Sequence, residues 1–135
     1  MSVVRLNILD DKFSLIAANR ASTVDGLRLL EYCVNDTHYM MWNRINGTLA
    51  SLSALLADEA FYPEFNQFVL RLLSVIRRQV TWDPPAGGES HFDTLLRSLV
   101  ISRLGYARDP DVMAEAKRRF DLHASGHTLL NADIR

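Results

Sequence analysis

The sequence predicts an all-α protein in which antiparallel helical hairpins stack into a HEAT/armadillo-like superhelical segment. Apolar residues recur three and four positions apart along nearly the whole chain, and no stretch shows the sustained alternation of a strand. Short polar, Pro- and Gly-containing loops separate about six such segments. Segments of about 12 to 20 residues with short connections indicate antiparallel neighbours. Hairpins of roughly 35 to 45 residues match the size of HEAT or armadillo units.

The composition is that of an ordinary water-soluble domain, or of one piece of a larger one, with 48% hydrophobic and 23% charged residues. The net charge is -1 and basic residues are scattered, so we expect no nucleic-acid partner. No apolar run approaches the roughly 18 residues of a membrane span. The charged N-terminus does not resemble a signal peptide, so we expect no membrane partner and a cytoplasmic location. The single cysteine, Cys33, is expected to be a buried, unreactive thiol.

The first two helical segments are expected to form a hairpin. Ser22, with Asp25 three residues later, predicts the start of the second segment through a weak capping box. Asn35-Asp36-Thr37 then breaks the chain and offers caps for a third helix. Asp10-Asp11 is expected to face solvent or to pair with Arg5. The predicted apolar stripes are Leu6, Leu9, Phe13 and Ile16 in the first segment and Val24, Leu27, Leu30 and Val34 in the second.

The middle of the chain carries the longest apolar stripes. We expect the fourth helix to start near Pro63, because proline is tolerated in a first helical turn. Its stripe is wide and indicates a helix about half buried. The predicted stripes are Trp42, Ile45, Leu49, Leu52 and Leu56 in the third helix and Phe65, Phe68, Val69, Leu72, Leu73, Ile76 and Val80 in the fourth.

Two further helices are expected after a Pro/Gly loop. Gly105 is the predicted C′ residue of the fifth helix, Asp109-Pro110 starts the sixth, and Ser125-Gly126 ends it. The predicted stripes are Phe92, Leu95, Leu96, Leu99 and Val100 in the fifth helix and Met113, Ala116 and Phe120 in the sixth.

Neither end of the chain shows the polar cap that a complete solenoid needs. One interpretation is disordered tails. The other is that residues 1–135 are one piece of a longer helical domain, truncated at both ends. A truncated solenoid exposes apolar surface, so we expect self-association or marginal stability.

The stretch VTWDPPAGGESHFDTLLR, residues 80–97, is either a phosphate-binding loop or a connector. Glycines before a helix suit a phosphate, but no Walker lysine is present and Glu89 would repel an anion. We therefore expect a connector in which Glu89 or Ser90 caps the fifth helix. Trp82 is expected to anchor the loop on the preceding hairpin. Arg97 is expected to reach a backbone carbonyl or a carboxylate in the next hairpin.

The other polar clusters give weak signals of chemistry. His123 and His127 have the spacing of a zinc-binding helix, but Ala124 stands where the catalytic Glu would be and Gly126 indicates that the helix is ending. Two surface histidines are the favoured interpretation. Lys117-Arg118-Arg119, near Glu115, is expected to be a solvated face.

Several strings resemble the zinc aminopeptidases of the gluzincin class, in particular their puromycin-sensitive branch. The most specific is TWDPPAGGESHFDTLLRSLVISRLG, which resembles the pattern G-W-D-x-x-x-G-E-x-H-x-x-x-L-L-R-x-x-V. RLNILDDKFSLIAANRAST, YMMWNRINGTLASLSALL, EAKRRFDLH and NADIR match in the same order, so the likeness covers nearly all of residues 3 to 135. The chain departs from the pattern in loops, with Asn19-Arg20 and Thr81 where the family has glycine.

The resemblance implies a non-catalytic part of a peptide-cleaving enzyme. The family's H-E-x-x-H-x18-E zinc motif and G-A-M-E-N substrate motif belong to earlier domains, and neither occurs in this sequence. No catalytic, metal-binding or cofactor-binding residue is therefore assigned here, and zinc belongs to the parent enzyme. Trp82, Glu89 and Arg97 are only a structural signature.

The family's C-terminal helical domain forms a bowl that encloses the peptide chamber and contacts the far end of the substrate. The matched segment would be its first part, with peptide substrates and the catalytic domain as partners. The peptide-contacting residues are not identified by the resemblance. Two alternatives are a free-standing helical adaptor that binds a protein partner and a small enzyme that uses His123 and His127.

Overall fold

The computed structural model describes residues 2–130, which form α-helices and one 3₁₀ turn. No β-strand occurs in this range, so the all-α prediction is confirmed. The elements are α1 (Ser2–Ala17), α2 (Thr23–Tyr32), α3 (Tyr39–Leu56), α4 (Tyr62–Leu73), the 3₁₀ turn η1 (Ile76–Gln79), α5 (His91–Tyr106) and α6 (Pro110–Ala124).

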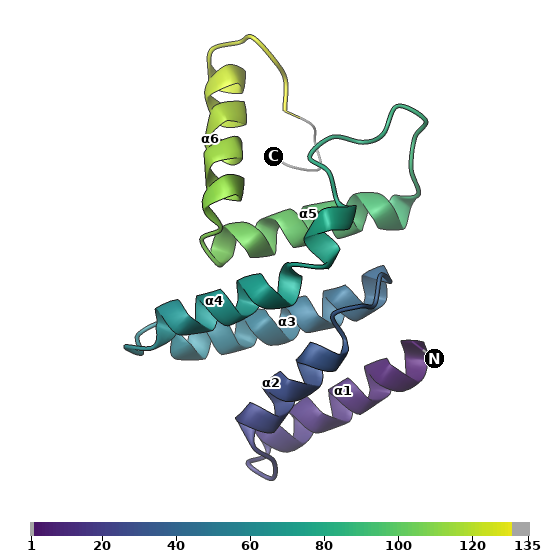
Figure 1. The fold of residues 1–135 in the computed structure, drawn as a ribbon, viewed down its shortest axis with the longest axis vertical. Helices are drawn as coiled ribbons and strands as arrows, with labels where there is room; N and C mark the ends of the chain where they lie inside the picture. The colour runs from purple at the N-terminus through teal and green to yellow at the C-terminus, as the bar shows by residue number, and fades with distance from the viewer. Residues whose placement is uncertain (1, 131–135) are drawn as a thin grey trace.

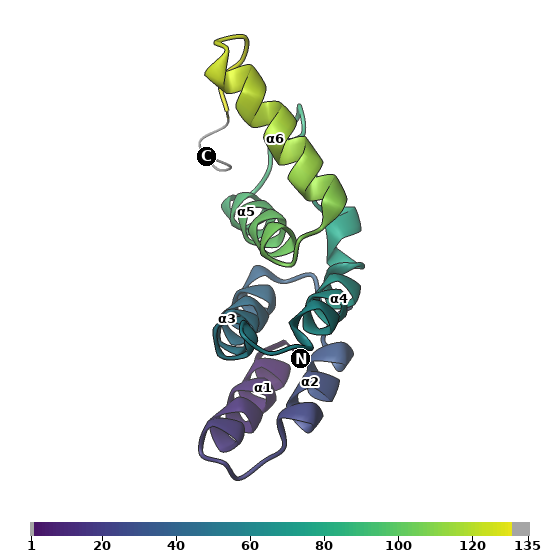
Figure 2. The same cartoon turned by 90° about the vertical axis from the view of Figure 1, so that its left-hand side faces the viewer.

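The helices form three hairpins stacked into an elongated array (Figure 1). Seen from the side, α1, α3 and α5 form one row and α2, α4 and α6 the other (Figure 2). In the first row α1 packs on α3 and α3 on α5, and α5 also contacts α4 and α6. The stacked arrangement is therefore present, and its assignment to the HEAT or armadillo class stays a prediction.

The core is centred on α3, which lies between the first and third hairpins. Trp42, Ile45 and Leu49 are fully buried, and Val100 of α5 is buried with them. Burial of an apolar side chain of this size contributes about 1.5–3 kcal/mol, so this layer is a substantial part of the hydrophobic stabilisation. The Trp42 indole N–H donates to the Asp36 carbonyl at 2.6 Å, which satisfies its polar atom inside the core.

Three helices end with the same backbone motif, and two of them use a residue other than glycine. Asn19 after α1 and Arg108 after α5 have φ of 57° and 62°, and Gly126 after α6 has φ of 75°. After α5 the N–H of Arg108 donates to Gly105 O and that of Asp109 to Leu104 O, both at 3.0 Å, which is the Schellman pattern. Gly105 is thus inside α5 and its predicted C′ role is wrong.

Asn19 tolerates this left-handed conformation better than most residues, so it can stand where the family pattern has glycine. The predicted end of the sixth helix at Ser125-Gly126 is confirmed.

The close approach of α1 and α2 depends on Gly26, a feature that the apolar stripes did not reveal. Gly26 is buried, and a Cβ atom at this position would lie 3.1 Å from Cζ of Phe13 and even closer to Ile16. There is consequently no room for a side chain where these two helices cross.

Two predicted helix starts use different groups from those expected. Ser22 is the N-cap of α2, but its side chain makes no capping hydrogen bond, so the capping box with Asp25 is absent. His38 is the N-cap of α3, in place of the predicted Asn35-Asp36-Thr37. Asp36 instead accepts the His38 backbone N–H at 2.9 Å, which shapes the turn before the helix.

Ion pairs join α1 to the second hairpin. Asp10 pairs with Arg44 of α3, and Arg5 lies 3.7 Å from the buried Asp36. Of the two expected alternatives, pairing with Arg5 is wrong, because α3 places another cation beside Asp10. Asp11 is exposed, as the other alternative expected.

The fourth predicted helix is divided in two. The α-helix ends at Leu73, and the buried Ile76 lies in the short turn η1. Arg77 of η1 donates to both carboxylate oxygens of Asp109, and Asp109 accepts the Val112 N–H at 2.9 Å as the N-cap of α6. The predicted start of α6 at Asp109-Pro110 is confirmed.

Several residues of the predicted stripes face solvent. Val24, Phe92, Met113 and Phe120 are between 47% and 61% exposed, and Ala116 is exposed as well. Val112 is the one buried residue of α6, which packs mainly against α5 in the described part of the chain.

Candidate functional site

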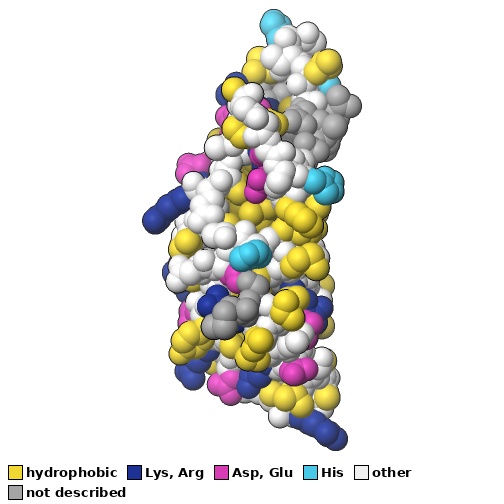
Figure 3. Space-filling view, turned by 90° about the vertical axis from the view of Figure 1, so that its right-hand side faces the viewer, with side chains coloured by type: hydrophobic (Ala, Val, Ile, Leu, Met, Phe, Trp, Pro, Cys, Tyr) yellow, Lys and Arg dark blue, Asp and Glu magenta, His cyan; other side chains and the backbone are white. Residues whose placement is uncertain are grey.

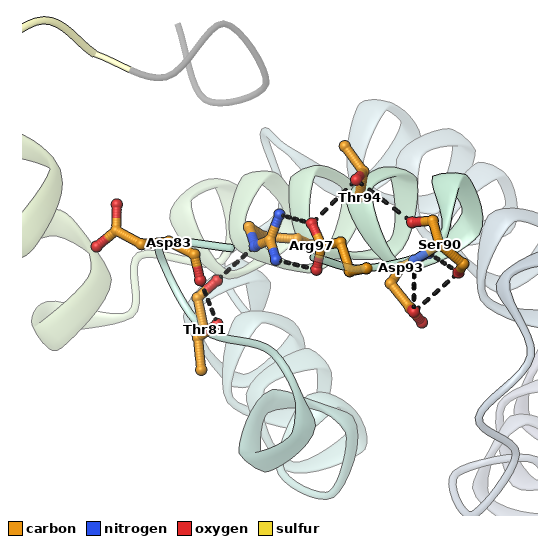
Figure 4. Close-up of polar contacts among 7 residues, drawn as sticks. Thr81, Asp83, Ser90, Asp93, Thr94 and Arg97 are labelled. Carbon is orange, nitrogen blue, oxygen red and sulfur yellow. Dashed lines mark hydrogen bonds and ion pairs between the residues drawn. The ribbon is translucent and has the colours of Figure 1, made fainter. Parts of the chain in front are cut away.

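The connector between η1 and α5 is held by Arg97, which is only 3% exposed. Its Nε donates to the Thr81 carbonyl at 2.8 Å, and its two terminal nitrogens bind the two carboxylate oxygens of Glu89 (Figure 4). Both partners lie in the loop before α5. Arg97 thus binds both a carbonyl and a carboxylate, but its predicted reach into the next hairpin is wrong.

The start of α5 shows why Glu89 is free to bind Arg97. Ser90 is the N-cap: its Oγ accepts the Asp93 N–H at 3.1 Å, and Asp93 accepts the Ser90 N–H at 3.3 Å. This capping box identifies Ser90, not Glu89, as the capping residue. Thr94 Oγ1 adds a 2.9 Å hydrogen bond to Glu89, which orients its carboxylate toward Arg97.

The electrostatics of this cluster favour a structural connector over a phosphate site. Hydrogen bonding from Arg97 holds the pKa of Glu89 below its ordinary value. A bidentate pair uses the charges of both groups, so neither is available to a phosphate or as an acid/base near neutral pH. Gly88, at φ 80°, closes a turn on the Pro85 carbonyl at 3.0 Å and gives the loop its shape.

A second arginine, Arg119 of α6, holds the other end of the loop. Its guanidinium lies 5.1 Å from the centre of the Trp82 ring and donates two hydrogen bonds to Asp83, at 2.8 and 2.7 Å. Trp82 is half-buried against the core. The loop is therefore anchored on α6. That Trp82 docks on the preceding hairpin stays a prediction.

Arg119 is also not part of a solvated face, because its side chain is only 18% exposed. Its Nε donates to Glu115 at 2.6 Å. Hydrogen bonds from Arg118 and then Arg119 lower the pKa of Glu115 to about 2. The solvated-face interpretation holds for Lys117 and Arg118, which are exposed.

The two histidines of the alternative enzyme hypothesis are used locally. Nδ1 of His123 accepts the Leu130 N–H at 3.3 Å, and Nδ1 of His127 lies 2.7 Å from Ser125 Oγ. Within residues 2–130, no three His, Cys, Asp or Glu side chains come together in a way that could hold a metal ion. This part of the chain therefore does not fit a zinc centre.

Cys33 lies at the C-cap of α2, and it is buried as expected. Its burial raises the pKa of the thiol, and Sγ lies 3.6 Å from the Leu29 carbonyl. A protonated, buried thiol is a poor nucleophile.

Arg103 is a buried charge that the sequence analysis missed. It is 7% exposed, its Nε donates to Asn46 Oδ1 of α3 at 2.6 Å, and its guanidinium lies 5.2 Å from the centre of the Tyr106 ring. Burial lowers the pKa of this arginine. A signal was available, because Leu96, Val100 and Arg103 continue one helical stripe with steps of four and three.

The side of the stack at which α1, α3 and α5 begin is partly apolar, with hydrophobic side chains beside histidines (Figure 3). A shallow hollow of about 260 Å³ lies between the starts of α3 and α5. Met40 and Phe92 line it and are more than half exposed, and the Tyr39 and Phe92 rings lie 5.8 Å apart. None of the helices in the described range is long and apolar enough to cross a membrane.

Comparison with known proteins finds aminopeptidases that align along 93 to 99% of this chain. Aminopeptidase A of Gloydius brevicauda is 29% identical over 126 residues, which is 93% of this chain and 13% of that protein. Aminopeptidase N of Lactococcus lactis subsp. lactis (strain IL1403) is 30% identical over 99% of this chain, and aminopeptidase M1-A of Oryza sativa subsp. japonica is 28% identical over 97%. The chain spans only 13 to 16% of the length of these relatives. Residues 2–135 match the model of one protein family throughout, and the chain therefore belongs to the ERAP1-like C-terminal domain family.

Proposed function

We propose that this chain is a non-catalytic segment of an aminopeptidase that removes N-terminal residues from peptides. The observation that carries the proposal is the family match over residues 2–135, together with aminopeptidase relatives that align along almost the whole chain. A free-standing adaptor is less favoured, because the relatives named above are aminopeptidases.

The chemistry of the described residues supports a structural role. Arg97, Arg119 and Arg77 are each paired with carboxylates. In this proposal the stacked hairpins form part of the wall around the peptide chamber. The zinc ion would be held by other parts of the parent enzyme, as the resemblance to gluzincins implies.

The partners in this proposal are peptide substrates and the catalytic domain of the parent. The exposed Met113 and Phe120 of α6 and the hollow beside Phe92 offer apolar surface for such contacts. The same surface supports self-association of the isolated chain. The cytoplasmic location and the puromycin-sensitive branch stay predictions.

The proposal is tested with the purified chain, added zinc and an aminoacyl-naphthylamide substrate. We expect no hydrolysis above that of a mock-purified control, because no described cluster can hold the metal. Turnover that co-purifies with the chain and disappears in a His123→Ala, His127→Ala variant would instead support the small-enzyme hypothesis.

A further inference from the structure

Arg103 differs from the other well-buried arginine in the described range because its charge is not neutralised. Arg97 is 3% exposed and binds Glu89, whereas Arg103 is 7% exposed and forms no ion pair with any residue of 2–130. A buried charge without a counter-ion lowers the stability of the folded chain. The burial of Arg103 therefore requires an explanation that the fold itself does not give.

The guanidinium of Arg103 retains most of its donors. It has five N–H groups, of which Nε–H is used by Asn46. Apart from Asp10 Oδ1, which is ion-paired with Arg44, no sealed side-chain nitrogen or oxygen of residues 2–130 lacks a hydrogen-bond partner, so the terminal nitrogens of Arg103 are not sealed from solvent. The Asn46 amide nitrogen likewise makes no hydrogen bond to a described residue. Two sets of donors thus meet at the junction of α3 and α5.

The surroundings of these donors favour a ligand with a single negative charge. The nearby Tyr106 ring attracts the guanidinium but does not neutralise it. Arg44, on the same helix as Asn46, is already paired with Asp10 and adds no second free cation. One guanidinium edge matches the two oxygens of one carboxylate, which it can bind through parallel hydrogen bonds.

We propose that Arg103 and Asn46 form a binding site for one carboxylate group. The carboxylate can be the C-terminus of a peptide or an acidic side chain of a neighbouring polypeptide segment, since both present the same two oxygens. The proposal follows from the geometry of α3 and α5 and does not depend on the aminopeptidase assignment.

The test is a titration of the full ¹⁵N-labelled chain, followed by NMR of the Arg103 Nε–H and Asn46 side-chain amide signals. The probes are N-acetyl-Ala-Ala-Ala with a free C-terminus and N-acetyl-Ala-Glu-Ala-amide, at ionic strength held constant with sodium chloride. N-acetyl-Ala-Ala-Ala-amide is the uncharged control. We expect at least one acidic probe to shift both signals saturably at millimolar concentration. The probe that binds more tightly identifies the source of the carboxylate.

Variants make the result specific to this pair. Asn46→Asp places a carboxylate beside Arg103, so it should abolish binding of both acidic probes. Asn43→Asp, on the exposed surface of α3 about one turn earlier, is the matched control and should bind as the unmodified chain does. Arg103→Lys keeps the charge but loses the bidentate geometry, so we expect binding about tenfold weaker.

The proposal is overturned if neither acidic probe shifts the two signals more than the uncharged probe does. It is also overturned if Asn46→Asp binds the acidic probes as well as Asn43→Asp does. The first of these results needs no variant, so it does not depend on whether a substituted chain folds.

Discussion

The two ends of α5 bury arginines in different ways. Near its start, Arg97 meets a carboxylate and a carbonyl of the loop that precedes the helix. In its last turn, Arg103 meets an amide oxygen and an aromatic ring, and no described carboxylate pairs with it. Both arginines belong to α5 and are buried to nearly the same depth, but only Arg97 has a carboxylate counter-ion among the described residues.

This difference distinguishes a charge that only holds the fold together from a charge that can still bind an anionic ligand. The Arg97–Glu89 pair fixes a long loop, and because both charges are already neutralised, an added anion would gain little binding energy there. The Arg103 charge costs free energy in the unliganded chain, which a suitable anion can recover on binding. Burial alone does not separate the two arginines, because both are almost completely buried.

The largest expected effect is that of Arg97→Met. The substitution leaves the Glu89 carboxylate without its cationic partner and releases the Thr81 carbonyl, so the loop loses its main attachment to α5. We expect the melting temperature, followed by circular dichroism at 222 nm, to fall by at least about 5 °C. Arg118→Met removes an exposed arginine of α6 that is paired with Glu115, and it should lower the value by less than about 2 °C. Equal shifts for the two variants would contradict the structural role of Arg97.

Acid should weaken the ion pairs that hold the loop before α5 in place. The pKa values of Glu89, Asp83 and Glu115 are all lower in the folded chain, chiefly through hydrogen bonds from Arg97, Arg119 and Arg118 respectively. The folded state therefore binds fewer protons than the unfolded state in this range. Its extra stability is present above the ordinary carboxyl values and is lost as pH falls through the lowered ones, down to about 2 for Glu115.

This acid effect is measured by thermal unfolding of the chain and of Glu89→Gln from neutral pH downward. We expect the variant to be less stable at neutral pH and the difference to vanish in acid, because protonated Glu89 no longer forms the ion pair. Asp121→Asn, at an exposed position of α6, serves as the control. A Glu89→Gln difference that stays constant down to the lowest pH would argue against the pair.

Asn46→Asp should give both buried arginines of α5 a carboxylate partner. It gives Arg103 the carboxylate that Arg97 already has, with little change of shape or helix propensity. Because a carboxylate neutralises the buried guanidinium and the amide does not, we expect a gain of about 1 kcal/mol in the free energy of unfolding, measured by urea titration. Asn43→Asp should give no gain. A loss of stability in Asn46→Asp would mean that Arg103 does not need a counter-ion.

The smallest expected effect is that of Arg103→Met, the same substitution as in the first prediction. Removing an unpaired buried cation while retaining an apolar stem should change the free energy of unfolding by less than about 1 kcal/mol in either direction. Urea titration of both methionine variants compares the two ends directly. If Arg103→Met is as damaging as Arg97→Met, the two arginines have the same structural role.

The sequence predicted the six helices and most core positions, because a period of 3.6 residues records which side of a helix meets a neighbour. It could not show whether that neighbour lies within this chain, so Met113 and Phe120 were predicted to be buried and are exposed. The close approach of two helices could not be predicted either, because apolar stripes do not reveal that α1 and α2 touch at Gly26.

For the candidate site, sequence reasoning identified Glu89 and Arg97 but not how they are joined. The sequence left Glu89 and Ser90 as alternative caps of α5, and the capping box of Ser90 with Asp93 identifies Ser90 as the cap. Arg103 was missed because it is a charged residue at a position of an apolar stripe, and a charged residue is easily taken for a surface position.

Asp109 does two tasks with one carboxylate: it caps α6 and it holds Arg77 of η1. The third hairpin therefore cannot tilt away from the second at this joint without breaking either the ion pair with Arg77 or the hydrogen bond that closes the first turn of α6. Because Asp109 is nearly buried, separating this pair costs more than parting two apolar surfaces, so the array should flex less here than at a joint held by apolar contacts alone.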